Sequence, residues 1–562
     1  MKVCKVLFIS LPTFSTEEYD YEHAKRRGIP LYPPIALATL ASSVHSLFSK
    51  ETEIRIFDYD YEIIRGLLAS EGKIERLDML LAPLLEEFRP DIVGLSYNFG
   101  LSTHHVVDIV HRIKIFSKDI VVFAGGNHAT LYHDEIMRHV PEIDYILRYE
   151  ADYTIVDFFN FLEERKAFED VQGLCRKSGG AIECTGYSRY PADLDSLPAP
   201  EWQLTDIGTY HTFGRIGSVF NYGDPDLPTY TVYTTRGCGG NCKFCTSKAF
   251  NGAKVRYRGA ESILHEIDDA YHRFGIRQFE ILDDDFTFSR KRALDFSRQL
   301  AARGYDLKWN LLNGIRLVTL DDELVESMIA SGLRLISVGI ESCHPDIMRK
   351  IRKQLNPDIL HEKMTLLNRY PELYVKGNFI FGFPYETWEH IQETARVARE
   401  LVLYWYIFSI FTPLPNTPLF KEVESAIPDF SKKYMLNRFK LDVYDIADSK
   451  HENYDYLKDL IGISMDEMSA FIGMLNLQLN FVENKNLQGR DVGRAIRDFE
   501  GILKFIKPDH AVAHACLQAG YSRLGDAPRA RQHGDTFRTI IDRDVSWRAK
   551  ALSLGLVLED GR

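Results

Sequence analysis

This chain lacks three features that would place it in a simple class: a dense set of cysteines, a surplus of basic residues and a long apolar run. Only eight cysteines occur in 562 residues, and three of them lie close together, at positions 238, 242 and 245. This usage excludes a disulfide-stabilised small fold and indicates a reducing compartment with one local metal site. Acidic residues outnumber basic ones by 80 to 68, which argues against nucleic acid as a partner.

Long apolar runs are missing throughout the chain. No stretch reaches the roughly 18–20 apolar residues that a membrane span requires, so no membrane span is expected. The short apolar start of the chain is followed at once by Pro12 and polar residues, which favours a first buried strand over a signal peptide. A cytoplasmic location is therefore expected.

Over residues 1–150, short apolar runs alternate with helical patterns. We expect strands near residues 3–9, 54–58, 92–97, 120–124 and 145–147. This alternation predicts a Rossmann-like, doubly wound parallel sheet with helices on both faces. Ligands of such sheets bind at the carboxyl edge, where the loops after the strands come together.

Residues 229–425 repeat this alternation with clear boundaries. Glycines follow three of the helical patterns, at Gly275, Gly304 and Gly332, where a helix is expected to end. Six strands are expected near residues 230–235, 278–282, 308–313, 335–341, 375–381 and 407–412. Six β/α units are too few for a closed eight-fold barrel, so they predict a partial (β/α)6 TIM barrel.

The two remaining segments have less regular patterns. Residues 151–228 are expected to form a connector with a small hairpin near residues 173–187. From residue 426 onward, helical patterns predict a C-terminal helical domain at 426–562. An ordinary helical bundle is expected there, and Pro508 with the Leu524-Gly525 pair leaves a tetratricopeptide-like hairpin as the alternative.

Cys238, Cys242 and Cys245 follow the first barrel strand with the spacing CxxxCxxC on a glycine-rich loop. Three thiolates can hold three irons of a four-iron, four-sulfur cluster, and the fourth iron is then open to a substrate or cofactor. A zinc site is the alternative, but no fourth ligand follows at zinc-finger spacing. The motif therefore predicts the cluster.

At these cysteines the sequence resembles the radical S-adenosylmethionine (SAM) superfamily, and Phe244 matches its usual aromatic residue before the third cysteine. The resemblance implies that the open iron binds SAM and that an external one-electron donor, of the flavodoxin or ferredoxin type, drives its cleavage to a 5′-deoxyadenosyl radical. Further positions that match SAM-binding motifs of the family, in order along the chain, are Asp283, Asp284, Arg316, Glu341, Ser342, Gly377 and Gly382. A helix N-cap for the aspartates and a surface position for Arg316 are the alternatives.

Residues 32–41 and 125–130 resemble the cobalamin-binding domain that is fused to many radical SAM enzymes. The resemblance implies that Pro34, Gly125, Gly126 and His128 lie at a cobalamin site. The Asp-x-His-x-x-Gly pattern that supplies a histidine to cobalt in other cobalamin proteins is missing, so we expect His128 to be a loop residue and not a metal ligand.

The family's Gly-Glu-Gly-Glu-like turn also differs in this chain, which has Tyr149-Glu150-Ala151-Asp152. The bulkier side chains leave a vestigial domain without cofactor as an alternative to a cobalamin site.

The resemblance implies an enzyme that uses the cluster, SAM and cobalamin to methylate an unactivated carbon of a small molecule. Ring formation or rearrangement without methyl transfer, as in the anaerobic porphyrin cyclase, is the alternative activity. A non-catalytic scaffold that binds a partner through its helical domain is the alternative from another class. The residues of the barrel wall are expected to be ordinary apolar ones.

Overall fold

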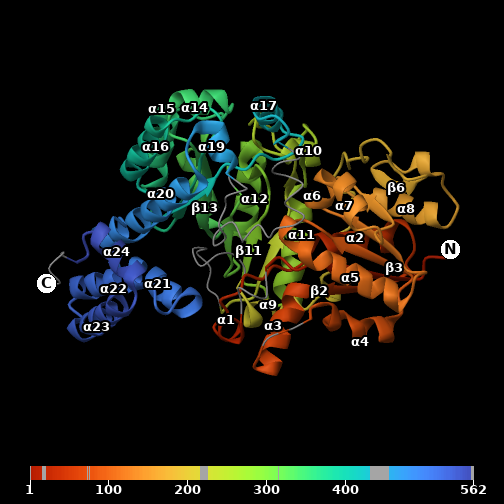
Figure 1. The fold of residues 1–562 in the computed structure, drawn as a ribbon, viewed down its shortest axis with the longest axis horizontal. Helices are drawn as coiled ribbons and strands as arrows, with labels where there is room; N and C mark the ends of the chain where they lie inside the picture. The colour runs from red at the N-terminus through yellow and green to blue at the C-terminus, as the bar shows by residue number, and fades with distance from the viewer. Residues whose placement is uncertain are drawn as a thin grey trace.

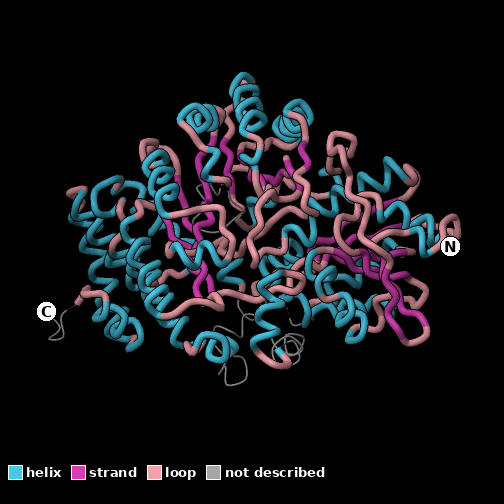
Figure 2. The backbone as a smooth tube through the Cα atoms, turned by 90° about the horizontal axis from the view of Figure 1, so that it is seen from above, coloured by secondary structure: helices cyan, strands magenta, loops and turns pink. Residues whose placement is uncertain are grey.

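The computed structural model describes residues 2–14, 20–72, 74, 76–215, 226–313, 315–430 and 455–557. An N-terminal sheet, a second sheet in the middle and a helical C-terminal part follow one another across the molecule (Figure 1). Seen from above, the strands of the two sheets form separate groups, each flanked by helices (Figure 2). No helix in the described ranges is long and apolar enough to cross a membrane.

The N-terminal sheet has the strand order β2-β1-β3-β4-β5-β6-β7. The first five strands in the chain are parallel: β1 Lys5–Ser10, β2 Glu53–Asp58, β3 Ile92–Ser96, β4 Val121–Gly125 and β5 Tyr145–Leu147. The order reverses between β1 and β3, and in sheets of this kind the ligand crevice lies at such a reversal. The predicted Rossmann-like fold is confirmed.

The helices of this domain cover both faces of the sheet, which explains why strand β1 is apolar on both sides. They are α1 Tyr21–Lys25, α2 Ile35–Leu47, α3 Tyr59–Ser70, α4 Asp78–Phe88, α5 Thr103–Phe116, α6 Asn127–Leu131, α7 His133–His139 and α8 Thr154–Leu162. The predicted hairpin forms β6 Leu174–Ser178 and β7 Ala181–Cys184, which extend the sheet in the antiparallel sense.

The hairpin contains a feature that the expectation of a reducing compartment did not predict. Cys175 and Cys184 are paired across β6 and β7, and they form a disulfide. The remainder of the connector contains the short helix α9 Tyr210–Phe213 and packs on the N-terminal domain, where the Tyr210 hydroxyl donates to Asp58 at 2.7 Å.

The second sheet is parallel throughout, with the order β15-β14-β13-β12-β11-β8. Its strands are β8 Thr229–Val232, β11 Gln278–Ile281, β12 Lys308–Leu311, β13 Leu333–Glu341, β14 Tyr374–Phe381 and β15 Trp405–Ile410. The predicted partial barrel is confirmed. Gly332 ends its helix at φ +106°, where a Cβ atom would lie 2.2 Å from the Leu307 carbonyl oxygen.

Helices alternate with these strands, and a two-stranded ribbon stands beside the sheet. The helices are α10 Ser247–Asn251, α11 Ala260–Arg273, α12 Arg290–Ala302, α13 Asp322–Ala330, α14 Pro345–Lys350, α15 Pro357–Leu367, α16 Trp388–Glu400 and α17 Pro418–Ala426. The ribbon pairs β9 Thr235–Arg236 with β10 Arg256–Tyr257.

The C-terminal part is helical, as predicted, and it covers the open edge of the barrel. Its helices are α19 Tyr456–Ile461, α20 Met465–Leu477, α21 Val492–Gly501, α22 Ala511–Arg523, α23 Ala527–Arg543 and α24 Val545–Ser553. The amide of Asn480 bonds both the N–H and the carbonyl of Tyr406, each at 2.8 Å, and so satisfies the backbone of this residue on edge strand β15. The tetratricopeptide-like assignment stays a prediction.

Some of the expected segments lie outside the described residues. These are residues 216–225 of the connector and residues 431–454 and 558–562 of the C-terminal domain.

Candidate functional site

The three motif cysteines lie on the loop that connects strand β9 to helix α10. The Gly240 N–H donates to the Cys238 sulfur at 3.3 Å, and the Ser247 N–H donates to the Cys245 sulfur at 3.4 Å. Burial raises the pKa of all three thiols, that of Cys245 to about 11. A metal must therefore displace protons from this loop when it binds.

The spacing of the three sulfur atoms favours a cluster over a single ion. A tetrahedral zinc ion with Zn–S bonds of about 2.3 Å places its sulfurs roughly 3.8 Å apart. Within the described residues, the three sulfur atoms of the motif do not all lie within 4.8 Å of one another. The loop thus fits a larger inorganic group.

The three aspartates after strand β11 point to three different partners. Asp283 accepts hydrogen bonds from the backbone N–H groups of Thr234 and Thr235, at 2.6 and 2.9 Å, just before the cysteine loop. Asp284 accepts from the Ser247 hydroxyl at 2.6 Å. Neither aspartate caps a helix, and Asp283 is buried and engaged in holding the loop.

Asp285, which sequence reasoning did not select, pairs with Arg316. The guanidinium donates twice to one carboxylate oxygen, at 2.9 and 2.6 Å, and the arginine side chain is only 18% exposed. Burial raises the pKa of Asp285, whereas the bonds and charge of Arg316 lower it. Arg316 is therefore a half-buried partner of the acidic run and not a free surface arginine.

At the end of strand β13, Glu341 has a φ of +69° and accepts a hydrogen bond from Lys353 at 3.0 Å. The charges of Glu341 and Cys242 both raise the pKa of Lys353, against burial, so this lysine lies close to the cysteine loop. Sequence reasoning missed Lys353 because it lies on the loop after α14, away from any strand end. Ser342 is fully buried, and its hydroxyl is 3.2 Å from that of Thr394.

Gly377 on strand β14 and Gly382 on the loop after it are required for different structural reasons. A Cβ atom at Gly377 would lie 2.5 Å from a methyl carbon of Leu403. Gly382 has a φ of +92°, and its N–H donates to buried Glu386 at 2.6 Å. Burial raises the pKa of Glu386 to about 7. Phe244 lies beside this loop, because its ring centroid is 5.5 Å from that of Phe383.

A cavity of about 430 Å³ lies between the two sheets and is lined from both. The N-terminal sheet supplies loop residues that follow β3, β4 and β5, among them Asn98 and Gly126. The barrel side supplies residues near the cysteine loop, among them Arg236 and Asp284. A bulky ligand bound at the carboxyl edge of the first sheet would thus face the cysteine loop of the second.

The predicted cobalamin-site residues lie around this cavity but not all in its lining. Gly125 and Gly126 line it. Pro34 is the N-cap residue of helix α2, and this helix lines the cavity through other residues. His128 lies on helix α6 and not on a loop, which corrects the expectation. Its ring packs between Tyr97 and Tyr132, at 4.7 and 4.6 Å between ring centroids.

Tyr149 also lines the cavity, at the position where the resembling family has glycine. Its φ of +67° is the left-handed conformation that glycine adopts without strain. The turn therefore keeps a glycine-like backbone although the side chain differs. The cavity beside it is lined from both domains, which argues against the vestigial alternative.

Four charged residues join the two domains next to the cavity, and we call them the interdomain ion network: Glu150, Asp152, Arg236 and Arg256. Arg236 donates to Asp152 at 2.6 and 3.0 Å and to Glu150 at 3.0 Å, and Arg256 donates to Glu150 at 2.9 Å. The side chains of Glu150, Asp152 and Arg256 are at most 8% exposed. Because Gly237 and Cys238 follow Arg236 directly, the network fixes the start of the cysteine loop.

The inner face of the barrel is polar, which corrects the expectation of an apolar wall. Phe279 and Trp309 stack on each other, and Trp309 packs against helix α12. Their neighbours Glu280 and Asn310 therefore point away from the helices, and both are at most 2% exposed. Burial lowers the pKa of Lys376 on β14 to about 8, and the charge of Glu280 opposes that shift.

Comparison with known proteins agrees with this geometry. A model of the radical SAM superfamily matches residues 232–398, and a model of the B12 binding domain matches residues 62–159. The chain is 28% identical over 421 residues to an uncharacterized methyltransferase of Pyrococcus horikoshii, covering 75% of this chain and 83% of that protein.

Two further proteins show how far the likeness extends. An anaerobic magnesium-protoporphyrin IX monomethyl ester cyclase of Cereibacter sphaeroides is 28% identical over 374 residues, which cover 63% of this chain and 56% of the cyclase. The solved structure of the cobalamin-dependent S-adenosylmethionine radical enzyme OxsB matches 100% of this chain and 82% of its own, with a TM-score of 0.63. At 15% identity, that structure shows a shared fold.

Proposed function

We propose, on the premise that this chain is a radical SAM enzyme with a fused B12 binding domain, that it methylates an unactivated carbon of a small molecule. The observation that supports this most directly is the cavity lined from both domains, because it brings the two carboxyl edges to one space. An enzyme that uses two cofactors on one substrate needs both of them within reach of it.

Residues of both domains are suited to hold the cofactors. Cys238, Cys242 and Cys245 would bind the four-iron, four-sulfur cluster, and the ends of β11, β13 and β14 would bind SAM. The loops after β3, β4 and β5 would bind cobalamin. When bound, the cluster supplies the electron that cleaves SAM, and cobalamin supplies the methyl group.

The chain's own residues position these groups. Asp283 holds the backbone before the cysteine loop through two N–H groups. The interdomain ion network fixes the same loop against the N-terminal sheet. The inner barrel face, with Glu280, Asn310 and Lys376, offers hydrogen bonds and charge to a polar small molecule.

The other partners follow from the same proposal. The open cluster requires a one-electron donor, of the flavodoxin or ferredoxin class, and a cytoplasmic setting supplies one. The acidic composition argues against nucleic acid as a substrate.

The test needs no substrate. Anaerobic enzyme loaded with reduced cobalamin is mixed with SAM, and S-adenosylhomocysteine is counted. Methylation predicts about one equivalent per bound cobalamin, and the same protein without cobalamin should release none.

The similarity to the porphyrin cyclase supports one alternative, ring formation without methyl transfer. That chemistry predicts 5′-deoxyadenosine during turnover and no S-adenosylhomocysteine. A cobalamin-loaded enzyme that forms no S-adenosylhomocysteine would therefore replace the methylation proposal with this one.

A further inference from the structure

Three potential metal ligands lie together in the N-terminal domain, away from the cysteine loop. They are His133 at the start of helix α7, Cys175 on β6 and Cys184 at the end of β7. One ligand atom from each lies within 4.8 Å of the other two. We propose that, when the Cys175–Cys184 disulfide is reduced, these three side chains bind one zinc ion.

The positions of the cysteines allow both states. Cys175 and Cys184 face each other across the antiparallel pair, with their Cα atoms 4.1 Å apart. A zinc ion with bonds of about 2.3 Å to sulfur needs the two sulfurs only about 3.8 Å apart, which a small side-chain rotation provides. Cys184 is exposed, so a reductant can reach the disulfide.

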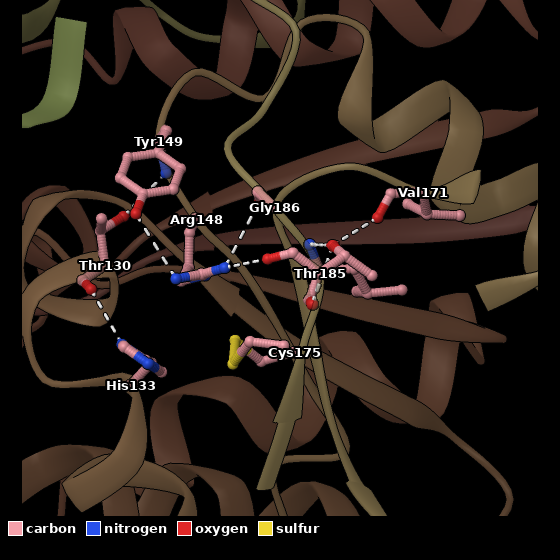
Figure 3. The surroundings of a disulfide bond; sticks show 10 residues. Thr130, His133, Arg148, Tyr149, Val171, Cys175, Thr185 and Gly186 are labelled. Atoms are coloured by element: carbon pink, nitrogen blue, oxygen red, sulfur yellow. Dashed lines mark hydrogen bonds between the residues drawn. A yellow bond between two sulfur atoms is a disulfide. The ribbon is translucent and has the colours of Figure 1, made fainter. Parts of the chain in front are cut away.

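The histidine is oriented as a zinc ligand requires. Its Nδ1 is 3.1 Å from the Thr130 carbonyl oxygen, a hydrogen bond that leaves Nε2 as the free ligand atom. A backbone carbonyl commonly fixes metal-binding imidazoles in this way. Figure 3 shows His133 and Cys175 on the same side of Arg148, whose guanidinium reaches toward Thr185.

The chemistry of the three groups suits zinc. Burial lowers the pKa of His133, and the charge of Arg148 lowers it further. Two thiolates and one imidazole are ligands that zinc prefers, and water can take the fourth position.

The conversion of the Cys175–Cys184 disulfide into the reduced, zinc-bound form conserves electrons and protons. A dithiol supplies two electrons and two protons to the disulfide and becomes a disulfide itself. The two thiols that form on the hairpin then lose their protons to solvent as zinc binds.

The experiment uses the full chain with Cys238, Cys242 and Cys245 changed to alanine, so that the cluster motif cannot bind zinc. The protein is reduced with a dithiol, freed of it without oxygen, titrated with ZnCl2 and analysed for bound metal. We expect about one zinc per chain. His133→Ala should weaken zinc binding about tenfold or more, and His139→Ala on the same helix should leave it unchanged.

The same protein oxidised before titration should lose two titratable thiols and bind no zinc at this site. His133→Ala must also lose two thiols on oxidation, which shows that its hairpin is intact. Zinc binding that survives oxidation, binding that is equal in the two histidine variants, or a reduced protein that retains no zinc would each overturn the proposal.

Discussion

Replacing Glu150 with glutamine should weaken the contact between the two domains without changing the shape of the side chain. Glu150 accepts hydrogen bonds from both Arg236 and Arg256. Asp152 continues to neutralise Arg236 in the variant, but Arg256 loses its only carboxylate in the interdomain ion network. Its side chain is 4% exposed, so water cannot replace that partner.

The magnitude follows from this burial. Removing one partner of a buried ion pair costs about 3–5 kcal/mol, because the other charge stays desolvated and uncompensated. The same change in an exposed pair costs roughly 0–1 kcal/mol. For a protein of 562 residues, with an unfolding entropy of about 2.1 cal/mol/K per residue, the buried loss should lower the melting temperature by roughly 3–4 °C.

The assay is thermal unfolding of anaerobic holoenzyme, with hydrogen exchange at the cysteine loop as a second measurement. Asp134→Asn is the matched control, because Asp134 pairs with Arg138 on an exposed helix surface, with side chains 46% and 68% exposed. We expect Glu150→Gln alone to melt lower and to exchange faster around Cys238. Equal melting temperatures in the two variants would refute the reasoning.

Three further predictions concern single features of the site. Changing Cys238, Cys242 and Cys245 together to alanine should reduce bound iron from about four atoms per chain to none, as measured after anaerobic reconstitution. Asp283→Asn should cost about 1–3 kcal/mol and speed the loss of iron on gel filtration, since an amide cannot accept from all of its present donors. Glu386 has a pKa raised by burial from 4.5 to about 7, so its contribution to stability falls as pH rises through that range. This fall in the free energy of unfolding amounts to about 3 kcal/mol between pH 4 and 8, and Glu386→Gln should remove it.

The elements of both sheets could be predicted because local patterns determine them. Each barrel strand is a short apolar run that a turn residue separates from a helical pattern, as at Gly332. The roles of the aspartates could not be predicted in this way. Asp283 meets Thr234 only because β11 and β8 pair in register, with Ile281 opposite Val232, and this pairing joins segments about 50 residues apart.

The disulfide shows the same limit at shorter range. The sequence predicted a hairpin near residues 173–187, and the structure contains one. Whether Cys175 and Cys184 meet depends on the register, because a shift by one residue would place them on opposite faces. A one-dimensional pattern gives the turn of a hairpin more reliably than its register.

The polar inner face of the barrel explains why the substrate class could not be predicted from the sequence either. In Phe279-Glu280 and Trp309-Asn310, the aromatic residue faces the helices and the polar residue faces the interior. Such strands read as apolar when their residues are averaged, because the aromatic side chains dominate. Burying Glu280 and Lys376 costs free energy that an apolar lining would avoid. A barrel that existed only to support the cysteine loop would have no use for these charges, whereas one that binds a polar molecule beside that loop requires them.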